Sequence, residues 1–178
     1  MGHLAIRGGE PQMRPMDLSL LRPNVGIVLI APTGKVWLGR RAKAPPPRNW
    51  QFPQGGIDVG EGDFDAALRE LREETGVTSV RLMGRTRDWL GYEFPPEHQG
   101  SKIAKGWRGQ KQIWFALAFE GRDDEIDLEA HGEVEFDRWR WADLDEALDE
   151  VIEFKRDVYR QVIAAFRPLV EQVREQAG

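Results

Sequence analysis

Three glutamates on one predicted helix are the residues of this chain best suited to chemistry. The segment RELREETG (69–76) places Glu70, Glu73 and Glu74 three and four residues apart, on one flank of a helix. In an isolated helix, each pair of like charges at this spacing costs about 0.2–0.5 kcal/mol. A solvated surface can bear that cost, whereas a cation bound between the carboxylates would replace repulsion with attraction. The spacing alone leaves both interpretations open.

The chemistry that such a cluster would support is phosphate chemistry with a divalent metal. Hard cations such as Mg²⁺ or Mn²⁺ prefer oxygen ligands and combine one or two carboxylates with the phosphates of a substrate. A bound ion polarises a phosphoryl oxygen and lowers the pKa of a bound water. Arg69 lies four residues before Glu73 and is placed to fix that carboxylate by an ion pair. Gly55 and Gly56 let the backbone approach the metal or phosphate closely.

The helix that carries these glutamates is predicted over residues 63–75. Asp63 is the expected N-cap, and Gly76 stands where a glycine commonly ends a helix. Four apolar residues at helical spacing form a stripe that would pack against a sheet. The stripe consists of Phe64, Ala67, Leu68 and Leu71.

The rest of the chain predicts strands before and after this helix. The apolar run at 25–31, the PTG turn at 32–34 and the segment 35–41 indicate a hairpin, followed by a loop at 43–50. Further strands are expected at about 79–92, 111–119 and 136–141, and a last helix from about residue 154. Strands mixed with helices predict an α/β sandwich. The chain contains neither of the glycine-rich phosphate loops G-x-G-x-x-G and G-K-[ST].

Composition favours one folded domain. The chain has 178 residues, of which 40% are hydrophobic, with a net charge of −5 and no cysteine. We expect a flexible arm at 1–20, the domain at 21–170 and a tail at 171–178. No apolar run approaches the roughly 20 residues of a membrane-spanning helix, and no secretory signal begins the sequence. These features predict a cytoplasmic location and no membrane partner.

A longer pattern surrounds the three glutamates. All the fixed positions of G-x5-E-x7-R-E-U-x-E-E-x-G-U, where U is a bulky aliphatic residue, are met by Gly55, Glu61, Arg69, Glu70, Leu71, Glu73, Glu74, Gly76 and Val77. The chain therefore resembles the Nudix hydrolases. The resemblance implies an α/β/α sandwich with a mixed sheet, a divalent cation, and hydrolysis of a nucleoside diphosphate linked to another group. It implies catalytic roles for Arg69 and the glutamates, and it leaves open which glutamate is the general base.

Segments outside this pattern look like the bacterial RNA 5′-pyrophosphohydrolases, which are also grouped as dinucleoside polyphosphate hydrolases. They are RPNVGIVL (22–29), WQFPQGGI (50–57), RDWLGYEFP (87–95), GQKQIWF (109–115), EFDRWRW (135–141) and FKRDVYRQV (154–162). The resemblance covers roughly residues 21–166. One departure is the proline-containing loop AKAPPPRN (42–49), which can change contacts with an RNA 5′ end.

The resemblance also suggests roles for residues far from the helix. Glu135 matches a further metal ligand, although alone it is one acid in an acidic stretch. Arg22 and Arg41 match arginines near the RNA 5′ end, and Gln54 would help to shape the substrate side. Phe154 and Lys155 match a pair that receives a nucleobase and a nearby phosphate. Phe154 also fits the apolar stripe of the last helix, so a core role is an equal alternative.

The leading hypothesis is a Mg²⁺-dependent hydrolase that removes pyrophosphate from 5′-triphosphorylated RNA. The first alternative is asymmetric cleavage of dinucleoside polyphosphates such as diadenosine tetraphosphate. A more remote alternative is a non-catalytic binding module, which the complete set of glutamates disfavours. The basic loop around residues 102–111 either guides a polyanion or is simply solvated. We predict no DNA partner and no role for the histidines, and the sequence is silent on protein partners.

Overall fold

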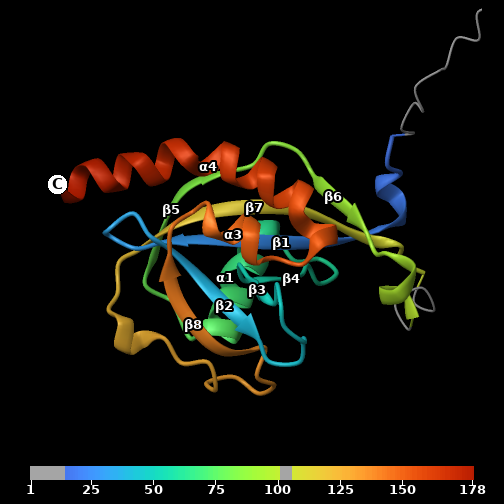
Figure 1. Cartoon of the computed structure of the whole chain (residues 1–178), viewed down its shortest axis with the longest axis horizontal. Coiled ribbons are helices and arrows are strands. Elements are labelled where there is room, and N and C mark those ends of the chain that lie inside the picture. The colour runs from blue at the N-terminus through green and yellow to red at the C-terminus, as the bar shows by residue number, and fades with distance from the viewer. Residues whose placement is uncertain (1–14, 101–105) are drawn as a thin grey trace, which may run out of the picture.

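A mixed β-sheet carries helices on both of its faces in the computed structural model, which describes residues 15–100 and 106–178 (Figure 1). The strands are β1 (Leu21–Ile30), β2 (Val36–Arg41), β3 (Trp50–Gln51), β4 (Gln54–Gly56), β5 (Val80–Arg85), β6 (Leu90–Glu93), β7 (Gly109–Phe119) and β8 (Phe136–Ala142). The α-helices are α1 (Asp63–Thr75), α3 (Glu146–Glu150) and α4 (Arg156–Ala177). Short 3-10 turns lie at Leu18–Leu20, Pro96–His98, Asp123–Glu125 and Glu153–Lys155.

The centre of the sheet is the pair β1 and β7. These strands are parallel and stay in register from Leu21 opposite Gly109 to Ile30 opposite Ala118. The other pairings are antiparallel: β2 and β4 with β1, β5 and β6 with β7, and β3 and β8 with β2. Parallel strands are normally buried on both faces, which agrees with the near-continuous apolar sequences of β1 and β7. The predicted mixed sheet is confirmed.

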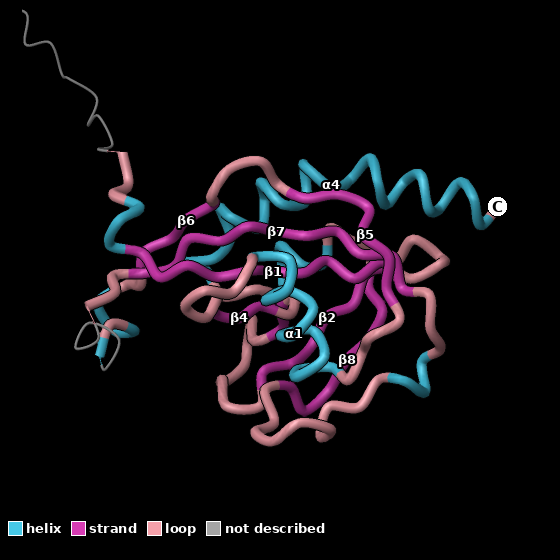
Figure 2. The backbone as a smooth tube through the Cα atoms, turned by 180° about the vertical axis from the view of Figure 1, so that it is seen from behind, coloured by secondary structure: helices cyan, strands magenta, loops and turns pink. Residues whose placement is uncertain are grey.

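Alternate side chains of β1 serve two separate cores. Val25, Ile27 and Leu29 pack on the side of α1, with Ala66, Ala67 and Leu71 of that helix. Val28 and Ile30 pack on the opposite side, with Val158, Tyr159, Val162, Phe166 and Val170 of α4. Figure 2 shows α1 in front of the sheet, and Figure 1 shows α4 on the other face. The α/β/α sandwich follows directly from the two-residue period of the buried strands.

Two local predictions need correction. The segment expected as one strand at 79–92 forms β5 and β6 with a break between them. Asp63 is not the N-cap of α1, because Gly62 occupies that position in an extended conformation. Asp63 is instead the first residue of the helix and accepts a hydrogen bond from Arg85 at 2.6 Å. Gly76 ends the helix with φ of 77°, as its position predicted.

The C-terminal part of the chain also differs from expectation. Helix α4 begins at Arg156, so Phe154 precedes it in a 3-10 turn. Helix α4 continues to Ala177, through most of the segment expected as a tail. The expected arm falls mostly outside the described residues, as do Lys102 and Lys105 of the basic loop. None of the helices in the described part of the chain is long and apolar enough to cross a membrane.

Candidate active site

The acidic flank of α1 forms one wall of a cleft of about 540 Å³. The glutamates come from α1, Gln54 and Gly55 from β4, and the remaining residues from segments distant in sequence. The predicted site residues that line this cleft are Arg22, Arg41, Gln54, Gly55, Glu70, Glu73, Glu74, Glu135, Phe154 and Lys155. The fold therefore gathers every predicted site residue around one cavity except Arg69, which lies behind the acidic wall.

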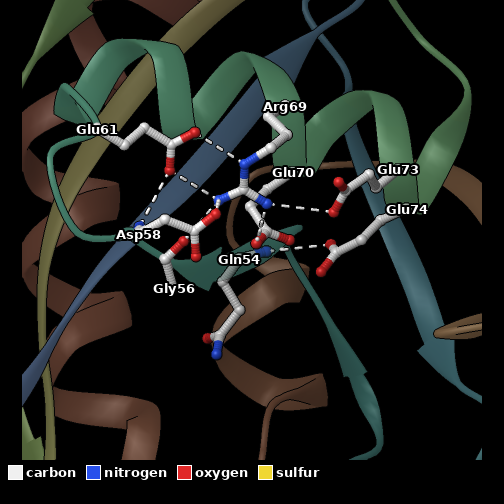
Figure 3. A network of polar contacts seen from close by, with 8 residues as sticks. All are labelled: Gln54, Gly56, Asp58, Glu61, Arg69, Glu70, Glu73 and Glu74. Carbon is white, nitrogen blue, oxygen red and sulfur yellow. Dashed lines mark hydrogen bonds and ion pairs between the residues drawn. The ribbon is translucent and has the colours of Figure 1, made fainter.

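Arg69 is the centre of a network of hydrogen bonds (Figure 3). Its Nε and Nη2 donate to Glu61 at 2.8 and 2.9 Å, and Nη2 also donates to the carbonyl oxygen of Gly56 at 2.8 Å. Its Nη1 donates to Glu70 Oε1 at 2.8 Å and to Glu73 Oε2 at 3.2 Å. The predicted pair of Arg69 with Glu73 is confirmed. The bonds from Arg69, with one from the backbone of Asp58, lower the pKa of Glu61 to about 2.

Glu74 is a buried carboxylate with few compensating contacts. Its side chain accepts a hydrogen bond from the backbone N–H of Gln54 at 3.3 Å. Burial raises the pKa of Glu74 well above its ordinary value, and the nearby charges of Glu70 and Glu135 raise it further. Burial also raises the pKa of Glu70, against the opposing effect of Arg69. The wall thus concentrates negative charge where water screens it poorly.

Gly55 is required at its position by the close approach of Glu70. A Cβ at Gly55 would lie 1.9 Å from Glu70 Cδ, closer than any real side chain can stand. The antiparallel pairing of Val25 with Gly55 holds β4 in this place. The glycine therefore lets a backbone segment and a carboxylate share the same corner of the cleft.

The donor chemistry of this wall fits a hard divalent cation. Among residues 15–100 and 106–178, no three carboxylate or imidazole side chains stand together as a ready metal cage. In this arrangement Arg69 engages oxygens of both Glu70 and Glu73. The wall nevertheless supplies only oxygen ligands. Burial, and to a smaller extent the neighbouring carboxylates, raise the pKa values of Glu70 and Glu74, and a bound cation would favour their charged forms.

Basic and polar groups line the same cleft. Arg22 is exposed and lies against Gly56, where an added Cβ would meet Arg22 Nη2 at 2.4 Å. Lys155 is 5% exposed, and its Nζ donates to Gln51 at 2.9 Å and to Gln54 at 3.3 Å. Acidic and basic groups in one cleft suit a ligand that carries phosphates together with bound cations.

Besides its acidic and basic residues, the cleft has a group of aromatic side chains around Phe154. The ring of Phe154 lies 5.5 Å from Tyr92, 6.2 Å from Phe94 and 5.2 Å from His98, between ring centres. Phe154 is partly buried against the core on the side of α4 and also lines the cleft. Its position is compatible with both of the roles considered for it, and the binding of a nucleobase stays a prediction.

Sequence reasoning missed several cleft residues. Tyr92, Phe94 and Gln110 line the cleft, and so do His98 and His131, for which no role was predicted. Tyr92 and Phe94 are two residues apart, a spacing that places both side chains on one face of an extended segment. For Tyr92 and Phe94, that alternation is a local pattern from which a shared position on one side of the strand could have been predicted.

Comparison with known proteins agrees with this architecture. A family model described as NUDIX domain matches residues 20–162. A protein of Caulobacter vibrioides named RNA pyrophosphohydrolase is 58% identical over 156 residues, which cover 87% of this chain and 91% of that protein. The solved structure of the E. coli dihydroneopterin triphosphate pyrophosphohydrolase has a TM-score of 0.62 at 22% identity, covering 82% of this chain and 99% of its own.

A second solved structure gives the same result for the fold. A C. elegans Ap4A hydrolase binary complex has a TM-score of 0.60 at 20% identity, covering 83% of this chain and 99% of its own. These two structures support the architecture alone, whereas the family model and the bacterial relative cover most of the sequence. This chain is therefore an enzyme that belongs to the Nudix hydrolase family.

Proposed function

We propose that this protein hydrolyses the 5′-polyphosphate of RNA, converting a 5′-triphosphorylated transcript and water into 5′-monophosphorylated RNA and pyrophosphate. The observation that carries this proposal is the 58% identity, over 87% of the chain, to a protein named RNA pyrophosphohydrolase. The cleft is compatible with such a substrate, because it combines an acidic wall, basic side chains and an aromatic group. We further propose that the protein acts in the cytoplasm, where it would meet transcripts.

The acidic wall would hold the divalent cation, which we propose to be Mg²⁺. Glu70, Glu73, Glu74 and Glu135 all line the cleft and supply carboxylate oxygens. Such an ion screens the charge of a phosphate chain and activates a bound water. Arg69 fixes the carboxylates of Glu70 and Glu73 by direct hydrogen bonds. The four glutamates line the cleft, and one of them would accept the proton of the attacking water.

The basic and aromatic residues of the cleft would bind the RNA. Arg22, Arg41 and Lys155 can donate to phosphate oxygens, and the planar group of an arginine can also stack on a base. Phe154 offers an aromatic face on the edge of the cleft. Stacking of a base on an aromatic side chain is worth about 1–3 kcal/mol and tolerates many sequences. This tolerance suits an enzyme that acts on the ends of different transcripts.

The test compares two substrates with one preparation of enzyme. We expect kcat/KM for 5′-triphosphorylated RNA to exceed that for diadenosine tetraphosphate. A Glu73→Gln variant should lose the activity toward both, which excludes a contaminating hydrolase. A large advantage for the dinucleotide would overturn the proposed substrate and leave the hydrolase chemistry in place. Full activity of Glu73→Gln would instead contradict the role of the acidic wall.

A further inference from the structure

A group of amide side chains borders the cleft, and Gln112 is the one member that does not line it. The group consists of Asn24, Gln51, Gln54, Gln110 and Gln112. Gln112 is 1% exposed and does not line the cleft. A buried amide is unfavourable unless its polar groups are hydrogen-bonded. Gln112 lies midway between Gln110 and Trp114 on one face of β7, so it can link the cleft to the core.

Trp114 determines which way the amide of Gln112 faces. The indole Nε1–H of Trp114 donates to Gln112 Oε1 at 3.1 Å. An indole N–H can only donate, so this contact requires the oxygen of Gln112 rather than its nitrogen. The oxygen and nitrogen of an amide have nearly the same shape, and a donor-only partner is what distinguishes them. The nitrogen of Gln112 accordingly donates to Asn24 Oδ1 at 2.8 Å and to Gln54 Oε1 at 3.3 Å.

Lys155 also determines the orientation of the Gln54 amide. Its ammonium group, which is also donor-only, donates to Gln54 Oε1 at 3.3 Å. Two independent donors, Gln112 and Lys155, therefore require the oxygen of the Gln54 amide, and not its nitrogen, to face them. The nitrogen of Gln54 then faces Gln110 and donates to Gln110 Oε1 at 3.3 Å. The hydroxyl of Tyr92 donates to the same oxygen of Gln110.

The direction of these bonds fixes what Gln110 can offer. Its oxygen accepts from both Gln54 and Tyr92, so its amide nitrogen is the group left for a ligand in the cleft. Because Gln110 lines the cleft and is only partly buried, its N–H groups are accessible to an acceptor there. Reversing Gln54 or Gln110 would place an oxygen toward phosphates, which repel it.

We propose that Gln112, oriented by Trp114, is a positioning residue for substrate binding. Through Gln54 it directs Gln110 to donate a hydrogen bond to an acceptor oxygen at the RNA 5′ end. This role rests on the proposed function and adds a specific claim to it. Gln112 acts without touching the substrate, and its effect passes through Gln110. If Gln112 served only to satisfy the indole of Trp114, its loss would change stability and leave substrate binding intact.

A double-mutant cycle on 5′-triphosphorylated RNA separates these two roles. Gln112→Met and Gln110→Met should each raise KM about tenfold, the equivalent of about 1.4 kcal/mol. The kcat values should stay within about twofold, because the acidic wall is unchanged. The double variant should be no worse than Gln110→Met alone, since the effects of residues in one hydrogen-bond network are not additive. Gln161→Met, the same replacement at an exposed position of α4, should leave KM unchanged.

Additive effects on KM, or an unchanged KM in Gln112→Met, would overturn the proposal. If Gln112→Met does not fold, Gln112→Leu, which is also uncharged and removes both amide donors, serves for the same cycle. A readout without substrate keeps the proposal separate from the proposed function. With ¹⁵N-glutamine labelling, we expect hydrogen exchange of the Gln54 side-chain amide to accelerate in Gln112→Met. Unchanged exchange would refute the network even if the enzyme prefers another polyphosphate.

Discussion

Arg69 donates two hydrogen bonds to Glu61, from Nε to Oε2 at 2.8 Å and from Nη2 to Oε1 at 2.9 Å (Figure 3). This bidentate pair joins the middle of α1 to the loop that precedes it. With both of these nitrogens engaged, Nη1 is the group that contacts Glu70 and Glu73. The orientation of the acidic wall therefore depends on a glutamate outside the cleft.

The pair makes stability depend on pH in a defined range. Glu61 has a pKa of about 2 in the folded protein, against an ordinary value of 4.5. Because the folded pKa is the lower one, the stabilisation is complete above pH 4.5 and is lost as the pH falls toward 2. We expect the difference in unfolding free energy between wild type and Glu61→Gln to shrink over that range, as measured by urea unfolding. Parallel profiles for the two proteins would contradict this assignment.

Gly55 should tolerate no side chain. In Gly55→Ala, the new Cβ would lie 1.9 Å from Glu70 Cδ in the present arrangement, so the carboxylate must move. We expect kcat/KM to fall about 100-fold, the effect of a displacement near 1 Å in an active site. Gly100→Ala is a matched control, because nothing lies within 4 Å of the added Cβ. Equal kcat/KM values for the two variants would show that activity does not depend on the position of the Glu70 carboxylate.

The charge of Glu74 should stabilise the folded protein when Mg²⁺ is bound and destabilise it when the metal is removed. In EDTA, Glu74→Gln should be at least as stable as wild type, because a buried and poorly compensated carboxylate is replaced by a neutral amide. Magnesium at about 100 times its dissociation constant should stabilise wild type by about 2.7 kcal/mol. The variant should gain clearly less. Calorimetric unfolding with and without Mg²⁺ measures both, and an equal gain in the two proteins would exclude Glu74 as a ligand.

Phe154 should affect substrate binding more than turnover. Phe154→Leu keeps an apolar side chain against the core but removes the aromatic face in the cleft. We expect KM for triphosphorylated RNA to rise about tenfold, near the lower end of the stacking energies measured per base. Phe64→Leu is the control, since Phe64 packs on the other face of the sheet at 5.4 Å from Phe115. An unchanged KM in Phe154→Leu would assign Phe154 to the core alone.

The sequence predicts the parts of this site that depend on local spacing. The glutamates of α1 share one flank because a helix brings residues three and four apart together, and the same rule anticipates the bond from Arg69 to Glu73. The near-continuous apolar run in β1 likewise anticipates a strand that is buried on both faces of the sheet. These features need no information about distant segments.

Several of the errors and omissions involve contacts between residues that are distant in the sequence. Aspartate is a preferred N-cap residue, yet the carboxylate of Asp63 instead accepts hydrogen bonds from Arg85, which is 22 residues away in the sequence. The break at 86–89 arises because β5 and β6 pair with different halves of β7. Tyr92 and Gln110 reach the cleft through strand pairing that no local pattern specifies.

We propose that the acidic wall, with its bound cation, cleaves the 5′-polyphosphate of RNA. The most direct measurement follows the products when a 5′-triphosphorylated RNA is incubated with enzyme and Mg²⁺. Pyrophosphate and 5′-monophosphorylated RNA should appear in equal amounts, and neither should form with Glu74→Gln or in EDTA. An RNA that keeps its triphosphate while the same enzyme hydrolyses diadenosine tetraphosphate would contradict the account.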